Sequence, residues 1–219
     1  MARLRCDISM SLDGFVAGPN PSLEQPLGEG GDLLHEWAFS ALSWREQHGL
    51  EGGEKNADSE VIEESIAATG AVVMGRRMFS GGEGPWEDDP RADGWWGDDP
   101  PFHVPVFVLT QHARETKVMQ GGTSFTFVTE GIEAALQQAQ AVAGEKDVLL
   151  AGGARVVQQY LKAGLLDEIQ IHLAPVLLGD GASLFDRLGI AAVGLEIRRV
   201  IASPSVTHLK LTAPRVELP

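Results

Sequence analysis

Two glycine-containing junctions carry the residues best suited to chemistry. In the first, the apolar run AVVMG (71–75) leads directly into Arg76 and Arg77. In the second, the run DVLLAGG (147–153) ends in two glycines just before a helix-period segment. Glycines let an anion approach the backbone, the start of a helix attracts it, and paired guanidinium groups add charge-assisted hydrogen bonds. The two junctions together predict a site for two phosphate groups of one dinucleotide.

Two aspartates outside these junctions could each have a structural or a functional role. Asp13, in SLDG, suits either a turn or a contact to substrate or nicotinamide, and Asp32 suits either a helix N-cap or a substrate contact. The histidines do not recur at metal-ligand spacing, so we expect no metal site. The single cysteine, Cys6, excludes a cysteine zinc cluster and an intrachain disulfide. It lies in the first apolar run, where we expect a buried strand thiol.

The elements that position these residues follow an α/β pattern, in which short β-rich runs alternate with helix-period segments. Helices are predicted at 32–49, 58–69, 131–144 and 154–164, with Asp58 and Ser59 as cap residues of the second. Strands are predicted at 4–14 (a strand, then a turn), 71–75, 104–110, 124–129, 147–153 and 167–179, and a terminal antiparallel hairpin at 195–203 and 206–212. Apolar and polar residues alternate along 167–179, which predicts one apolar face for that strand.

Two long segments fit neither a helix nor a strand. Residues 18–31 are rich in Gly and Pro, whereas residues 80–103 are acidic and carry Trp86, Trp95 and Trp96. Loops of that length in a compact domain are lids, interface elements or disordered segments. The tryptophans argue against disorder, so we expect the 80–103 segment to cover the pocket or to contact a partner.

Composition limits the class of protein and its partners. The chain has 219 residues and a formal net charge of −14. This charge argues against nucleic acid or an anionic membrane surface as the main partner, because both need a basic footprint. The N-terminus lacks an apolar signal region, and no apolar stretch approaches about 18 residues. We expect one cytoplasmic domain spanning residues 1–219, with a small-molecule substrate.

Five motifs in a fixed order resemble a known family: ISMSLDGFVAG, AVVMGRRMF, VFVLTQHAR, LLAGGARVVQQYL and LAPVLLGDGASLF. The chain is similar to the dihydrofolate-reductase-like superfamily, most closely to the reductase domain of bifunctional riboflavin-biosynthesis proteins, the RibD C-terminal family. The resemblance covers nearly the whole chain. It implies a three-layer α/β/α fold, a mixed, mostly parallel sheet with a C-terminal antiparallel hairpin, NADPH across the carboxyl edge of the sheet, and a homodimer.

The resemblance also implies where each part of the cofactor binds. The backbone of Val16 and Ala17 would touch the nicotinamide carboxamide, with Ser9 beneath the ring. The phosphates and adenosine would contact a turn at Gly75, Arg76 and Arg77, a strand end at Leu109, Thr110 and Gln111 with Arg114 nearby, and a pyrophosphate loop at Gly152, Gly153, Ala154, Arg155 and Val156. Within this set we favour Arg76 for the 2′-phosphate, with support from Arg77. Met78 replaces a threonine that is frequent in the family, so one hydroxyl contact to phosphate is missing.

Further departures from the family narrow the function. The chain lacks the H-x-E and P-C-x-x-C motifs of the zinc deaminase, so deamination is excluded. We expect an NADPH-dependent reductase that transfers hydride to a small polar heterocyclic or carbonyl substrate, resembling 5-amino-6-(5-phosphoribosylamino)uracil reductase, with Asp32 or Asp13 at the substrate. The alternatives are a dihydrofolate or pterin reductase and a non-catalytic nucleotide-binding protein on the same fold.

Overall fold

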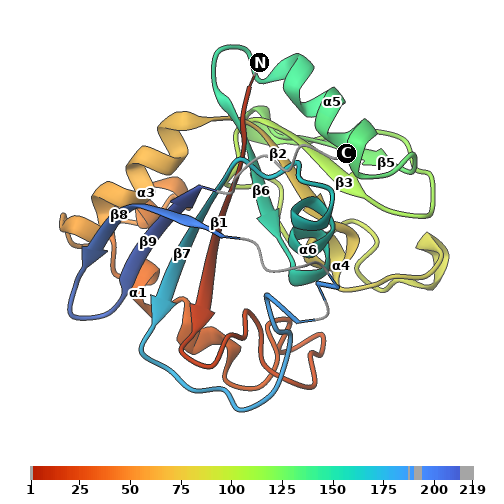
Figure 1. The fold of residues 1–219 in the computed structure, drawn as a ribbon. Helices are drawn as coiled ribbons and strands as arrows, with labels where there is room; N and C mark the ends of the chain where they lie inside the picture. The colour runs from red at the N-terminus through yellow and green to blue at the C-terminus, as the bar shows by residue number, and fades with distance from the viewer. Residues whose placement is uncertain (1, 187, 190–193, 213–219) are drawn as a thin grey trace.

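The computed structural model describes residues 2–186, 188–189 and 194–212, and these form one mixed β-sheet with helices on both faces (Figure 1). The strand order is β4-β5-β3-β2-β6-β1-β7-β9-β8. The inner strands are parallel, whereas β4, β8 and β9 run antiparallel to their neighbours. The strands are β1 (Leu4–Ser11), β2 (Thr69–Gly75), β3 (Pro105–Leu109), β4 (Lys117–Val118), β5 (Ser124–Val128), β6 (Asp147–Gly152), β7 (Glu168–Ala174), β8 (Glu196–Ala202) and β9 (Thr207–Thr212). The predicted mixed, mostly parallel sheet and its C-terminal hairpin are confirmed.

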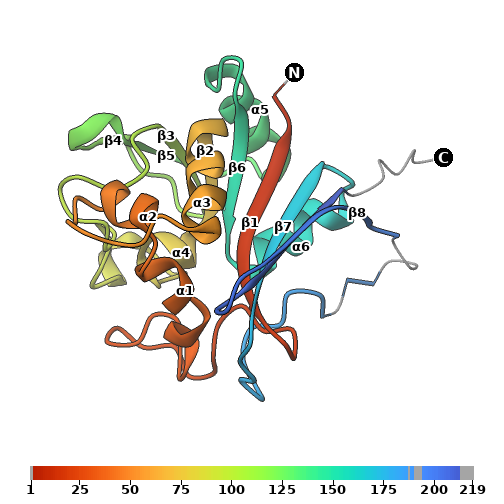
Figure 2. The same cartoon turned by 90° about the vertical axis from the view of Figure 1, so that its left-hand side faces the viewer.

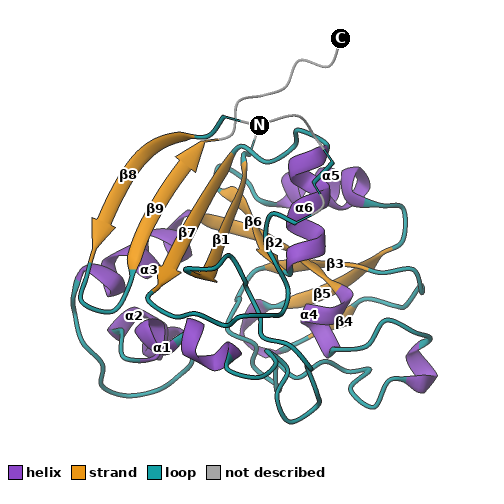
Figure 3. Cartoon of the chain, turned by 60° about the horizontal axis from the view of Figure 1, so that its bottom comes forward, coloured by secondary structure: helices purple, strands orange, loops and turns teal. Residues whose placement is uncertain are grey.

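The helices form a layer on each side of the sheet (Figures 2 and 3). One layer holds α5 (Ile132–Val142) and α6 (Ala154–Lys162), and the other holds α1 (Glu36–Phe39), α2 (Leu42–Gln47), α3 (Ala57–Ala68) and α4 (Arg76–Ser80). Three 3₁₀ turns complete the set, at Gly31–Leu34, Trp86–Asp88 and Gln120–Gly122. Among the helices of the described ranges, none combines the length and the apolar character that a membrane crossing needs.

The two faces of the sheet differ in chemistry along β1 and β7. On the α5–α6 face these strands place buried apolar residues, including Cys6, Ile169 and Ile171. On the α3 face the same strands and β9 place polar residues: Arg5, Asp7, Ser9, Gln170, His172, His208 and Lys210. The alternation predicted for residues 167–179 is therefore confirmed, and α3 covers a polar strip of the sheet.

The acidic 80–103 segment packs on the apolar part of the α3 face. The Trp86 ring lies 4.9 Å from Phe127, and its Nε1 donates to the carbonyl of His112 at 2.8 Å. The Trp96 Nε1 donates to the carbonyl of Phe79 at 3.1 Å. The tryptophans thus fasten this long segment to the carboxyl-terminal half of β2, β3 and β5, next to the first glycine junction.

The helix predicted at 32–49 is wrong, because the structure divides it into a 3₁₀ turn, α1 and α2. Ala41 has extended backbone angles of −73° and 133°. It sits where the chain pairs with Glu54: the Leu42 N–H donates to the Glu54 carbonyl at 2.9 Å and the Glu54 N–H donates to the Ser40 carbonyl at 2.7 Å. This long-range pairing satisfies the backbone in place of helical bonds. The helix predicted at 58–69 is confirmed, but its N-cap is Asn56, whose side chain accepts from the N–H of Ser59.

Candidate active site

The two glycine junctions lie side by side at the carboxyl edge, because β2 and β6 are neighbours in the sheet. Gly75 ends β2 before α4, and a Cβ there would lie 2.8 Å from Val156 Cγ2, so glycine lets α6 pack closely. Gly152, with φ +117°, ends β6 and precedes Gly153, the N-cap of α6. A Cβ on Gly153 would meet no described atom within 4 Å. The backbone at the start of α6 is therefore open to a ligand.

One carboxylate lies between the arginines of the two junctions. Glu83 Oε1 is 2.5 Å from Arg77 Nε and accepts from Arg155 Nη1 at 3.1 Å. Arg77 belongs to the first turn of α4 and Arg155 to the first turn of α6. All three side chains are at least half exposed. The two junctions thus converge on a single carboxylate oxygen.

Arg76 points elsewhere. Its side chain is 6% exposed, its Nη2 lies 2.6 Å from Asp89 Oδ2, and its guanidinium carbon lies 3.5 Å from the centre of the Trp86 ring. Burial lowers the pKa of Arg76, which the Asp89 carboxylate partly opposes. The guanidinium is enclosed by the 80–103 segment, so the residue that we favoured for the 2′-phosphate has no open path to a ligand in this conformation.

The adenosine side of the predicted site lies at the end of β3. The carboxyl end of β3 places Leu109, then Thr110, whose N–H donates to the Val128 carbonyl at 3.1 Å, and the exposed Gln111. Arg114 Nη2 donates to Asp93 Oδ1 at 2.6 Å, and its guanidinium carbon lies 5.0 Å from the Trp86 ring centre. Every arginine predicted to bind phosphate is therefore paired with a carboxylate from the 80–103 segment.

The nicotinamide side of the predicted site lies at the end of β1. The Val16 N–H donates to the Ala182 carbonyl at 2.9 Å, and the Ala17 carbonyl accepts from the Ala182 N–H at 2.9 Å. The hydroxyl of Ser9 is buried and accepts from the Trp37 indole N–H at 3.1 Å. The chain itself thus uses part of the hydrogen-bonding capacity that the family resemblance assigns to the cofactor.

The family follows from the sequence match over residues 2–209, which corresponds to the RibD C-terminal domain. This chain belongs to the RibD C-terminal domain family. No curated protein matches the sequence. The family match covers all five sequence motifs, from the first strand to the segment before the terminal hairpin.

Solved structures share the RibD C-terminal fold at low sequence identity. A riboflavin biosynthesis protein from Shewanella sp. PV-4 superimposes with a TM-score of 0.61 at 22% identity, over 98% of this chain and 100% of that chain. The diaminohydroxyphosphoribosylaminopyrimidine deaminase/5-amino-6-(5-phosphoribosylamino)uracil reductase of Thermotoga maritima gives 0.54 at 13% identity, over 97% of this chain and 57% of that chain. Acinetobacter baumannii RibD gives 0.55 at 15% identity, over 98% and 58%. The chain thus spans a little over half of the last two proteins.

The two predicted catalytic aspartates lie outside the strands, Asp13 in the turn after β1 and Asp32 in the first 3₁₀ turn. Asp13 accepts from the Ser11 hydroxyl at 2.6 Å and from the N–H of Gly179 at 2.7 Å. The Ser11 hydrogen bond, followed by the Gly179 bond, lowers the pKa of Asp13. Asp32 is exposed in the first 3₁₀ turn, two residues after the left-handed Gly30. The contacts of Asp13 give it a clear role in joining two loops.

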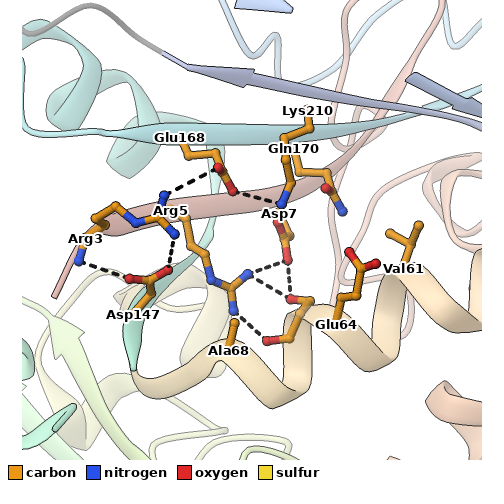
Figure 4. A pocket seen from close by; sticks show the side chains of 11 residues that line it. Arg3, Arg5, Asp7, Val61, Glu64, Ala68, Asp147, Glu168, Gln170 and Lys210 are labelled. Atoms are coloured by element: carbon orange, nitrogen blue, oxygen red, sulfur yellow. Dashed lines mark hydrogen bonds and ion pairs between the residues drawn. The ribbon is translucent and has the colours of Figure 1, made fainter. Parts of the chain in front are cut away.

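Two cavities flank α3 in the described part of the RibD C-terminal fold. The smaller, about 60 Å³, lies at the amino-terminal end of β1 and is crossed by ion pairs (Figure 4). There Arg5 donates to Asp7 and to Ser65, each at 3.0 Å, and Lys210 lies 3.2 Å from Glu168. These charges neutralise one another at the edge opposite the glycine junctions, so we assign no ligand to this cavity.

The larger cavity, about 360 Å³, has the size of a small-molecule site. Apolar side chains from α3, β2 and β6 form much of its wall, and its polar lining includes Asp7, Gln47, Ser65, Thr69, His103, Lys146 and His172. His172 neighbours Ser9 in the β1–β7 register, on the same face. Thr69, Lys146 and Val104, by contrast, lie at the amino-terminal ends of β2, β6 and β3, so most of the cavity lies away from the glycine junctions.

A buried group that the sequence did not single out lies beside this cavity. His172 Nδ1 is 2.7 Å from His208 Nδ1, and His208 Nε2 is 3.0 Å from Asp58 Oδ1. The two histidines are 36 positions apart, so only the strand pairing brings them together.

Proposed function

We propose that this RibD C-terminal domain is an NADPH-dependent reductase of a small polar heterocyclic or carbonyl substrate. The observation that carries the proposal is the Glu83 carboxylate held between Arg77 and Arg155. A carboxylate held by two arginines at two helix starts supports the binding of a phosphate oxygen of the cofactor at the same place. Cofactor binding then requires Glu83 to leave.

The order of the strands matches the order of the parts of a dinucleotide. Along β1, β6, β2 and β3, the carboxyl edge presents Ser9, then the Gly152–Gly153 junction, then Gly75, then Leu109. We assign the nicotinamide to β1, the pyrophosphate to the space between the β6 and β2 junctions, and the adenosine to the end of β3. This assignment moves the phosphate role from Arg76 to Arg77 and Arg155, and gives the 2′-phosphate to Arg114 after displacement of Asp93.

The residues present fit this cofactor. The open backbone at Gly153, the nine-residue helix α6 behind it and the two exposed guanidinium groups form an anion site without a metal ion. When bound, the reduced nicotinamide supplies the hydride. The chain's own contribution is to fix the phosphates, orient the ring over β1 and exclude water from the substrate.

For the substrate, we propose the class of heterocycle for which one of the structural neighbours is named. The Thermotoga maritima protein is named for the reduction of a substituted uracil. We extend that substrate class to this chain as part of the proposal.

The direct experiment measures NADPH binding and its oxidation against a panel of pyrimidines, pterins and small carbonyl compounds. We expect NADPH to bind and at least one heterocycle to be reduced. Failure of the protein to bind NADPH at low ionic strength would overturn the proposal, and binding without turnover of any compound would favour the non-catalytic alternative.

Association into a homodimer stays a prediction. The outermost strand β8 exposes Ile197 and Val200, which are 66% and 52% exposed. Apolar residues on an edge strand favour contact with a second copy. Sedimentation of the full chain at micromolar concentration is expected to show a dimer, and a monomer there would contradict it.

A further inference from the structure

The larger cavity, which opens at the edge of the sheet opposite the glycine junctions, is an elongated space between α3 and the strands. Its volume is about 360 Å³. Its sheet wall comes from four adjacent strands, β2, β6, β1 and β7, through Val72, Leu149, Asp7 and His172. Adjacent strands lie about 4.8 Å apart, so this wall spans about 14 Å across the sheet.

Between its two ends the cavity is mainly apolar. Helix α3 contributes three aliphatic side chains, Val61, Ile62 and Ile66. Residues 101–104 complete the wall, and Gln47 at the end of α2 holds them by donating to the Pro101 carbonyl at 2.8 Å. An apolar wall with a few polar groups is typical of a small-molecule site.

Several polar residues of the lining are satisfied by the protein itself. The Ser65 hydroxyl donates to Asp7, and the Thr69 hydroxyl donates to the Ser65 carbonyl at 2.7 Å. Asp7 also accepts from Arg5 at 3.0 Å. These groups therefore need no ligand.

The buried end of the cavity carries a polar atom without a partner. His172 is 6% exposed, and burial lowers its pKa to about 4, so the ring is neutral near pH 7. Its Nδ1 lies 2.7 Å from His208 on β9, and the two nitrogens of an imidazole ring point in divergent directions, so Nε2 points away from β9, toward the side of the cavity. Nε2 has no hydrogen-bond partner within residues 2–186, 188–189 and 194–212. Buried polar atoms are normally partnered, so this nitrogen needs a ligand or a water molecule.

The open end of the cavity favours an anion. Lys146 is exposed just before β6, and its ammonium group has no carboxylate partner in the described part of the chain. His103, on the other side of the start of β2, already faces Asp99 at 3.8 Å. At the buried end, by contrast, the Asp7 carboxylate would repel an anion, so a neutral polar group is favoured there.

We propose that this cavity is a second ligand site, for an elongated aromatic carboxylate that carries a hydroxyl group at the end opposite its carboxylate. The carboxylate binds beside Lys146, and the apolar body packs against the aliphatic wall. The hydroxyl binds His172 Nε2, because a hydroxyl can donate or accept and so suits either tautomer of the ring. The site lies away from the cofactor edge, so the inference does not depend on NADPH binding.

Nitrogen-15 NMR of the full chain, labelled at histidine and titrated with p-hydroxycinnamate, tests the site. We expect a saturable shift of the His172 Nε2 resonance, with the same affinity when NADPH is added. Cinnamate, which lacks the hydroxyl, should bind about 2- to 10-fold more weakly, the range for one neutral hydrogen bond. The methyl ester of p-hydroxycinnamate lacks the charge and should bind about 1.5- to 5-fold more weakly, the range for an exposed ion pair. The absence of a shift at millimolar ligand would mean that the cavity holds only water, and competition by NADPH would place the ligand at the cofactor edge; either result overturns the proposal.

Two variants locate the ligand within the molecule. Lys146→Ala should weaken p-hydroxycinnamate by about 1.5- to 5-fold and leave the ester unaffected. Lys162→Ala is the matched control, because Lys162 is an exposed lysine of α6, on the other face of the sheet. Ile66→Trp fills the cavity from α3 and should abolish the shift; Ile66 is 37% exposed, so the fold can accommodate the larger side chain, and thermal unfolding checks it. Binding retained in folded Ile66→Trp, or the same affinity in the two lysine variants, overturns the proposal.

Discussion

Arg76 and Arg77 are adjacent in the sequence and in the same short helix, yet their surroundings are opposite. Arg76 is 6% exposed, between a carboxylate and an indole ring. Arg77 is 55% exposed and shares one carboxylate with Arg155 from another helix. Neighbouring positions in a helix point about 100° apart, so one faces the 80–103 segment and the other faces the sheet edge.

This difference in exposure indicates which of the two arginines can exchange its carboxylate partner for a ligand. The Trp86 ring covers the Arg76 guanidinium, and the Ser80 hydroxyl donates a hydrogen bond to its partner Asp89 at 2.7 Å. Releasing Arg76 would leave a buried carboxylate without its counter-ion, which is costly. Glu83 is held by exposed groups, and pairs of that kind contribute little to stability. Arg77 is therefore free to bind a ligand, whereas Arg76 holds the acidic 80–103 segment in place.

The largest effect is expected for Arg76→Ala. It leaves Asp89 buried and unpaired, and we expect a loss of about 3 to 5 kcal/mol in the free energy of unfolding. Urea denaturation measures it, with Arg77→Ala as the matched control, which should stay within about 0.5 kcal/mol of wild type. Equal, small losses in both variants would show that the two arginines do not differ as described.

An intermediate effect is expected for Asp89→Asn, which should lower the free energy of unfolding by about 1.5 to 3 kcal/mol near neutral pH. Burial raises the pKa of Asp89, but hydrogen bonds from Ser80 and the Arg91 N–H, followed by Arg76, outweigh it, so its pKa lies below its ordinary value. A carboxyl with a lowered folded-state pKa stabilises the fold above its unfolded pKa and loses this contribution as pH falls through the folded pKa. The stability gap between wild type and Asp89→Asn should therefore narrow below about pH 4. A gap that stays constant down to pH 2 would contradict an ionised Asp89.

The smallest effect is expected for Glu83→Gln. The exposed Glu83 pairs contribute on the order of 0.2 to 1 kcal/mol, so removing the competing charge should tighten NADPH binding by about 1.5- to 5-fold. Unfolding should not change. Glu87→Gln, in the same acidic segment, makes the same charge change away from the two arginines and serves as the control. Equal tightening in both variants would attribute the effect to net charge rather than to competition for Arg77.

The sequence predicted the framework of the site well because that framework is local. The strand ends at Gly75 and Gly152, the following helix starts and the terminal hairpin all follow from short-range patterns of apolar residues and glycines. The break at Ala41 could not be predicted, because it depends on pairing with Glu54, which no periodicity encodes.

The ion-pair partners of the charged residues could not be predicted from the sequence. Nothing in GRRMF tells Arg76 from Arg77, since the choice depends on where the distant Asp89 and Glu83 fold back. The same limit hid the His172–His208 contact, which the register of β7 and β9 creates. Local chemistry identifies candidates, and tertiary pairing decides which of them are free.

The central claim is that Arg77 and Arg155 bind the pyrophosphate, and titration of NADPH and NADH at fixed ionic strength tests it most directly. Each of Arg77→Ala and Arg155→Ala should weaken both cofactors about ten- to hundredfold, the equivalent of about 1.5 to 3 kcal/mol for a charge-assisted contact. Arg198→Ala, on the distant strand β8, should leave both affinities at their wild-type values. Unchanged affinities in the two junction variants, or a loss confined to NADPH, would contradict the claim.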